Sequence, residues 1–136
     1  MGVENRLMIY QNPNPSKNVC GDCVVRALSL ALNEEWSVIY ADLCELGGHI
    51  YRMPNDKDCF KTYLTRRGFQ RTPISNKKGS KRPTVRSFAE EHKTGTYVLE
   101  VAHHLVTVKD GHYYDIWDCG NKSLYGFWNR PDPRAT

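Results

Sequence analysis

The spacing of apolar residues changes near position 95, and this change limits the possible folds more than any other feature of the chain. Before it, apolar side chains recur every three or four residues between loop-forming segments, as they do in amphipathic helices. After it, β-branched and aromatic residues crowd into short runs separated by Gly, Asp and Lys, as they do in β-strands. This order predicts an α+β protein, with N-terminal helices packed on a C-terminal antiparallel sheet.

The first part of the chain is predicted to hold four helices. The first begins at Cys23, with Asp22 as its N-cap, and ends near Leu32. The other three have expected N-caps at Asn33, Asn55 and Thr84, and two of them are expected to end at Gly47-Gly48 and Gly68. Positions 73–83 show no periodicity, so they are predicted to form an exposed loop, whose basic residues lie within 77–82.

The second part is predicted to form a sheet around one hairpin. Lys109-Asp110-Gly111 is a strong turn signal, because Gly111 tolerates a left-handed backbone. With a three-residue loop, Val108 would pair with His112. The strands of this hairpin are expected at 104–108 and 112–117, further strands at 96–101 and 124–128, and an edge strand or ordered arm at 7–10.

Length and charge narrow the class of protein. A chain of 136 residues suffices for one hydrophobic core, so 1–136 is predicted to be a single domain, with 1–18 as an N-terminal arm and loop. A net charge of +4 falls short of the concentrated basic surface of a dedicated nucleic-acid binder. No apolar run approaches the roughly 18 residues that cross a bilayer, so no membrane partner is expected. The first ten residues lack the basic region and the apolar block of a secretion signal, so a cytoplasmic location is expected.

Cys23 is the first candidate for a chemical role. Residues 11–18 favour a loop because they hold two Asn-Pro pairs, and the helical pattern starts soon after them. A cysteine on a first helical turn faces unpaired backbone N–H groups and the positive end of the helix dipole, which stabilise a thiolate. Such a thiolate is a nucleophile when a base is near it. A buried, unreactive thiol is the alternative interpretation.

The predicted hairpin supplies a base. His103 and His104 lie at the start of its first strand, and His104 is opposite Ile116 in the expected register. Asp115 and Asp118 both lie within about two residues of that position, which is within reach of a side-chain hydrogen bond. Strict alternation does not choose between the two carboxylates, because a bulge beside the turn would exchange the faces.

The order of these residues resembles the papain-like cysteine peptidases. Cys23 opens a buried helix, His104 begins a strand, and Asp115-Ile116-Trp117 follows on the next strand, where that fold carries its third catalytic member in an Asn-x-Trp motif. Four segments more closely resemble a group of small phage and bacterial proteins related to the C39-like bacteriocin-processing peptidases. They are residues 21–28, 95–99, 104–111 and 114–118, within a resemblance that runs from about 12 to 128.

The resemblance implies a papain-like fold and a triad of Cys23, His104 and Asp115, with Asp118 as the alternative third member. It favours His104 over His103, because apolar strand residues follow the histidine in the family pattern. For Asp118, the alternative is a structural role as the cap of its own loop.

The resemblance also indicates where the substrate would bind. Related enzymes place a Gln before the nucleophile as an oxyanion donor, and the comparable positions here hold residues 16–18. The amide of Asn18 and the backbone N–H of Cys23 are therefore the expected donors. The expected cleft residues are Cys20, Gly21, Asp22 and Trp117.

The implied activity is that of a cysteine peptidase-like hydrolase, which acts on a peptide or isopeptide bond through a thioester acyl-enzyme. The alternatives are an acyl transferase and a papain-like module that binds a host protein without catalysis, and the expected setting is the cytoplasm of a bacterial or phage-infected cell. Cys20-x-x-Cys23 would also suit half of a zinc site or a thiol–disulfide motif. No second Cys-x-x-Cys follows and the cysteine count is odd, so no metal, cofactor or disulfide framework is expected.

Overall fold

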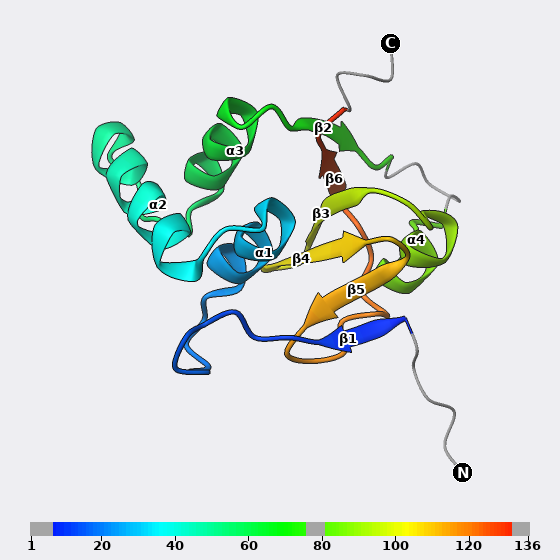
Figure 1. The fold of residues 1–136 in the computed structure, drawn as a ribbon. Helices are drawn as coiled ribbons and strands as arrows, with labels where there is room; N and C mark the ends of the chain where they lie inside the picture. The colour runs from blue at the N-terminus through cyan, green and yellow to red at the C-terminus, as the bar shows by residue number, and fades with distance from the viewer. Residues whose placement is uncertain (1–6, 76–80, 132–136) are drawn as a thin grey trace.

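The computed structural model describes residues 7–75 and 81–131. This part of the chain holds four helices and six strands that form one sheet (Figure 1). The helices are α1 (Cys23–Leu32), α2 (Trp36–Ile50), α3 (Lys57–Arg66) and α4 (Val85–Glu91). The strands are β1 (Met8–Tyr10), β2 (Gln70–Pro73), β3 (Thr96–Val101), β4 (His104–Lys109), β5 (His112–Asp115) and β6 (Gly126–Asn129). The predicted α+β class is confirmed.

The C-terminal strands β3 to β6 pair antiparallel as predicted, but the sheet as a whole is mixed. The strand order is β1-β5-β4-β3-β6-β2, and β1 pairs in parallel with β5 while the other neighbours are antiparallel. Of the two predictions for 7–10, the edge strand is confirmed, held by bonds such as Tyr113 N–H to the carbonyl of Leu7 at 2.8 Å. The other edge, β2, lies between two helices in the chain and is mostly exposed, so it lacks the apolar pattern by which strands are recognised.

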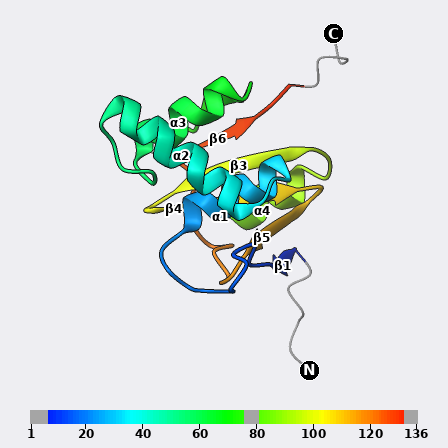
Figure 2. The ribbon, with the colours of Figure 1, turned by 60° about the vertical axis from the view of Figure 1, so that its left-hand side comes forward.

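The helices cover both faces of the sheet. Alternate strand residues point to opposite faces, and Val98 and Leu105 join the core beneath α1, α2 and α3, whereas Leu99 and Val106 join the core beneath α4. Figure 2 shows α1 and α2 stacked over the sheet, with α3 beside them. Within the described ranges, no helix is long and apolar enough to span a membrane.

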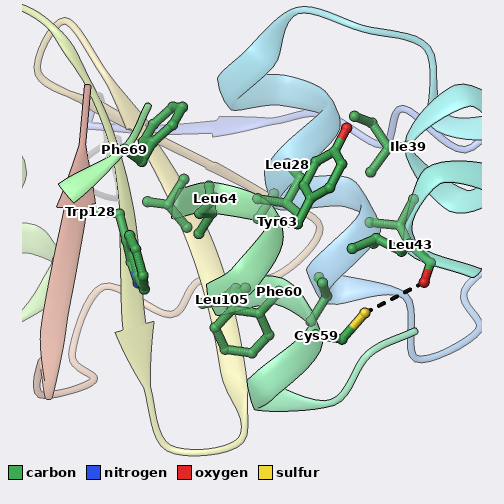
Figure 3. Packing of buried hydrophobic residues seen from close by; sticks show 14 of the residues in the cluster. Leu28, Ile39, Leu43, Cys59, Phe60, Tyr63, Leu64, Phe69, Leu105 and Trp128 are labelled. Atoms are coloured by element: carbon green, nitrogen blue, oxygen red, sulfur yellow. Dashed lines mark hydrogen bonds between the residues drawn. The ribbon is translucent and has the colours of Figure 1, made fainter. Parts of the chain in front are cut away.

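The larger core packs α3 between the sheet and α2 (Figure 3). Phe60, Tyr63 and Leu64 of α3 are buried, as its apolar spacing predicts. The buried Cys59 thiol donates to the carbonyl of Leu43 at 3.4 Å, which gives this cysteine a structural role. At about 25 cal/mol per Å² of buried apolar surface, side chains of this size are the main source of stability.

Two predicted helix boundaries are wrong, for identifiable reasons. Asn33 caps the C-terminus of α1 in the left-handed conformation (φ 54°), so α2 begins later, after Glu35. Gly47 lies inside α2 and is buried, and a Cβ there would be 2.4 Å from the carbonyl oxygen of Arg52. This glycine is needed for a close approach of backbone, and it does not end the helix.

The predicted N-cap is wrong for α3 and confirmed for α4. Asp56, and not Asn55, caps α3, since its carboxylate accepts from the backbone N–H of Asp58 at 2.9 Å. Thr84 caps α4 as predicted, in a capping box with Ser87. Of the predicted basic loop at 77–82, positions 77–80 lie outside the described residues.

The central hairpin has a two-residue turn, and the predicted register is wrong by one. Asp110 and Gly111 both have positive φ, at 50° and 85°, as a type I′ turn requires. Val108 therefore pairs with Tyr113, and not with His112. This register determines which residues of β5 share a face with His104.

Candidate active site

The site forms where the N-terminus of α1 meets the beginning of β4. Two hydrogen bonds dock the helix across this strand: the Thr107 hydroxyl donates to the carbonyl of Ala27 at 2.6 Å, and Lys109 Nζ donates to the carbonyl of Leu30 at 2.8 Å. Cys23 is the first residue of α1 and is half-buried. The docking brings its thiol within hydrogen-bonding reach of the His104 ring and of the backbone of Leu105.

His104 is held by Asp115. Its Nε2 lies 2.5 Å from Asp115 Oδ2, and both side chains are buried. Because Nε2 is engaged with the carboxylate, Nδ1 is the ring nitrogen left to interact with Cys23. The carboxylate thus fixes the orientation of the ring, and the structure brings together the three residues of the predicted triad.

The hairpin register explains why Asp115 reaches His104. If the pairing of Val108 with Tyr113 is continued along the strands, Asp115 and Trp117 fall on the face that carries His104, whereas Asp118 falls on the other. The ring centroids of His104 and Trp117 are 4.8 Å apart, as this register requires. The two-residue turn thereby makes the choice that alternation alone left open.

Asp118 has a different role in the structure. Its Oδ1 accepts from the Tyr113 hydroxyl at 2.5 Å and from the backbone N–H of Gly120 at 2.9 Å, and its Oδ2 lies 3.7 Å from Arg86. These contacts organise the loop after β5, which agrees with the alternative interpretation of Asp118 as a loop cap.

The electrostatics of Cys23 and His104 favour a charged pair. Burial by itself raises the pKa of the Cys23 thiol, but hydrogen bonds from His104 and the Leu105 backbone, with the charges of His104 and Arg26, lower it below its ordinary value. Burial likewise opposes the charge on His104, yet the hydrogen bonds to Asp115 and Cys23 raise its pKa to about 9. Both shifts therefore favour the charged pair, a thiolate beside an imidazolium.

Arg26 is a buried residue of the site that the sequence interpretation missed. It lies on α1 one turn after Cys23 and forms an ion pair with Asp22, and its Nη2 is 3.5 Å from Asp115 Oδ1. The Asp22 carboxylate also accepts from Trp36 Nε1 at 2.8 Å and makes no side-chain hydrogen bond to the helix start, so its predicted role as a capping side chain is wrong. The spacing of Asp22 and Arg26 is a helical i, i+4 pair visible in the sequence, but the contact with Asp115 is not.

The start of α1 offers backbone donors. Because Asp22 does not cap it, the N–H groups of the first turn, including that of Cys23, lack a side-chain acceptor from the N-cap residue. The second predicted oxyanion donor, Asn18, is exposed, its backbone carbonyl accepts from Asn12 Nδ2 at 3.2 Å, and it is not among the residues that line the cleft.

A cleft of about 870 Å³ runs past Cys23 and around the tip of the β3–β4 hairpin. One wall comes from the loop before α1 and from the start of α3, and the other from the loop after β5. Gly21 and Trp117 line it, as predicted for the substrate cleft. Cys20 is exposed outside the lining, and the buried Asp22 is engaged with Arg26.

One cluster in the described ranges has the composition of a metal site. Potential ligand atoms of His104, Asp115 and Cys119 lie within 4.8 Å of one another. His104 Nε2 and Asp115 Oδ2 are already in direct contact at 2.5 Å, and the Cys119 thiol donates to the same Asp115 Oδ2 at 3.3 Å. Ligands around one zinc ion lie about 2.0–2.3 Å from it and so stand further apart than the His–Asp pair. Burial and the Asp115 charge also raise the pKa of the Cys119 thiol, which favours a hydrogen-bond donor over a thiolate ligand.

Comparison with known proteins adds no relative: no family model, curated protein or solved structure matches the chain. The functional argument therefore depends on the geometry of the site.

Proposed function

We propose that the protein is a cysteine peptidase-like hydrolase with a papain-like fold. The observation that carries this proposal is the buried contact of His104 with Asp115 at 2.5 Å, on an imidazole that is within hydrogen-bonding reach of the Cys23 thiol. A nucleophile, a base and a group that orients the base are the three parts that acyl transfer through a thiolate needs. The cleft beside Cys23 supplies access for a polypeptide segment.

The reaction follows from the charged pair. The Cys23 thiolate attacks the carbonyl carbon of a peptide or isopeptide bond, and the oxyanion accepts hydrogen bonds from N–H groups at the start of α1. The carbon–nitrogen bond breaks as the leaving amine takes a proton from His104, which leaves a thioester. Water then attacks the thioester while His104 accepts its proton, the carbon–sulfur bond breaks, and the acid product leaves as the Cys23 thiolate forms again beside the protonated His104.

The test is selective labelling of Cys23. Incubation with a thiol alkylator or a peptide aldehyde should modify Cys23 far faster than Cys44 and Cys119, which are half-buried and buried. Mass spectrometry would then identify the substrate among the proteins that the wild type traps or cleaves and that Cys23→Ala leaves intact. If the three cysteines are labelled equally, and Cys23→Ala yields the same cleavage products as the wild type, the hydrolase proposal is contradicted and a binding module is favoured.

A further inference from the structure

The wall of the cleft after β5 is tied to the end of the basic loop. Residues 82–86 run beside residues 120–124, and Thr84 pairs with Ser123 in an isolated bridge. Three further backbone bonds fasten the two segments: Leu124 N–H to Pro83 O at 3.0 Å, Val85 N–H to Lys122 O at 3.0 Å, and Arg86 N–H to Gly120 O at 2.9 Å. Arg82 is thereby held next to the cleft.

Arg82, Lys122 and Tyr125 together form what we call the basic wall. The guanidinium carbon of Arg82 lies 4.9 Å from the centroid of the Tyr125 ring, and Tyr125 and Lys122 both line the cleft. Among the residues that the structure describes, neither Arg82 nor Lys122 forms an ion pair, and the buried Nε of Arg82 has no hydrogen-bond partner. The wall therefore presents two cations and an aromatic face.

The other charges near the cleft are compensated. Arg26 is paired with Asp22 and Asp115, Glu100 with Arg71, and Asp118 with Arg86. Lys57, on the opposite wall, is the exception: Asp56 and Asp58 beside it contact Arg52, and Lys57 itself forms no ion pair among the described residues. Among the described residues, the basic wall thus holds two cations without an ion-pair partner, so this side of the cleft is positive.

We propose that the basic wall is a subsite for an acidic side chain, so that the bonds presented to Cys23 lie next to Asp or Glu in the substrate. The inference rests on the proposed hydrolase function and adds its substrate class. A guanidinium binds a carboxylate through two parallel hydrogen bonds, and an ammonium adds a point charge. The exposed faces of Trp117 and Tyr125 would cover the apolar stem of the acidic residue.

The first experiment compares two alkylators of Cys23 that differ in charge, iodoacetate and iodoacetamide. In both reactions a carbon–sulfur bond forms and iodide leaves, so the ratio of their rates reports the electrostatic potential at the cleft. Reversal of both charges in Arg82→Glu/Lys122→Glu should lower the ratio of iodoacetate to iodoacetamide rates by about fivefold or more at low salt.

The control is Lys93→Glu, which reverses a single charge elsewhere. Lys93 contacts Gly111 at the turn of the hairpin, at the end opposite to His104. In Lys93→Glu, the ratio of iodoacetate to iodoacetamide rates should stay within about twofold of the wild-type ratio. A ratio that is unaffected in the double variant, on a Cys23 that still reacts, would overturn the subsite and leave the hydrolase proposal standing. Failure of Cys23 to react with either reagent would contradict the hydrolase proposal instead.

The second experiment measures binding without turnover. Cys23→Ala should bind a Glu-containing fluorescent peptide about tenfold more tightly than its Gln counterpart, and Arg82→Glu/Lys122→Glu should abolish this preference. Amidated and free-acid forms of each peptide distinguish an acidic side chain from a C-terminal carboxylate. Equal binding of the Glu and Gln peptides, or displacement of the peptide by a single-stranded RNA oligonucleotide at equal concentration, would overturn the proposal.

Discussion

Arg26 Nη2 lies 3.5 Å from Asp115 Oδ1, and both side chains are buried. This contact joins the helix that carries Cys23 to the strand that orients His104. It also gives the buried Asp115 carboxylate a second cationic partner beside His104. The helix with Cys23 and the strand with Asp115 are therefore connected by a buried ion pair, in addition to the contacts of Cys23, His104 and Asp115 themselves.

Removing this cation should destabilise the protein strongly. Arg26→Met leaves Asp22 and Asp115 buried without their partner, which should lower the free energy of unfolding by about 3–5 kcal/mol. Burial raises the pKa of Asp22, but the hydrogen bond from Trp36 and the charge of Arg26 outweigh burial and lower this pKa below its ordinary value of 3.8. The ion pair of Asp22 with Arg26 therefore stabilises the fold above pH 3.8, and this stabilisation is lost as the pH falls below that value. Urea unfolding at neutral and acidic pH should therefore show a smaller difference from wild type in acid.

Arg71→Met is the matched control for Arg26→Met. Arg71 donates to the buried Glu100 at 2.9 and 3.0 Å, so this variant also removes the partner of a buried carboxylate. It should destabilise the fold while Cys23 keeps its alkylation rate under native conditions. If Arg26→Met also kept that rate, Arg26 would be structural only, without a positioning role for the triad.

The charged pair predicts a characteristic pH dependence for Cys23. Because the pKa of Cys23 is lowered and that of His104 is raised to about 9, the alkylation rate of Cys23 should rise at a pH below the ordinary thiol value of 9.0. The stabilisation from protonated His104 is fully present below 6.5 and is lost as the pH rises through about 9. Thiolate absorbance against pH, with Cys23→Ser as the blank, measures the pair directly. A single titration at the ordinary thiol value would contradict it.

The two aspartates of the hairpin region should differ sharply in their effects. Asp115→Asn replaces the charge that orients His104, so hydrolysis should fall by about 100-fold or more and the pKa of His104 should drop from about 9. Asp118→Asn removes an acceptor in the loop after β5, so it should cost about 1 kcal/mol of stability and leave the titration of Cys23 unchanged. Equal loss of activity in both variants would return Asp118 to consideration as the third member.

The turn of the hairpin can be tested separately from the chemistry. Gly111 has φ +85°, and a Cβ there would meet its neighbours only at ordinary contact distances from 3.5 Å. Gly111→Ala should thus destabilise the fold by about 1–2 kcal/mol through backbone strain alone. Thermal unfolding measures this cost, and Cys23 reactivity should remain at the wild-type level. A larger loss with altered reactivity would indicate that the hairpin register had shifted.

Much of the local structure was predictable from short-range patterns. The helix from Cys23 to Leu32 and the strand from Thr96 to Val101 have the predicted bounds, because spacing and capping act within a few residues. A predicted boundary failed at Gly47, because the chain after α2 folds back so that the Arg52 carbonyl oxygen occupies the space of a Cβ there.

By itself, the sequence determined the class of fold and placed Cys23 on a helix and His104 and Asp115 on neighbouring strands, because periodicity and turn residues are local properties. Only the tertiary structure decided which carboxylate contacts His104, and the partners of Arg26 and Arg82. Those contacts join residues up to 89 positions apart. Which distant groups meet depends on how the helices dock on the sheet, which no local pattern encodes.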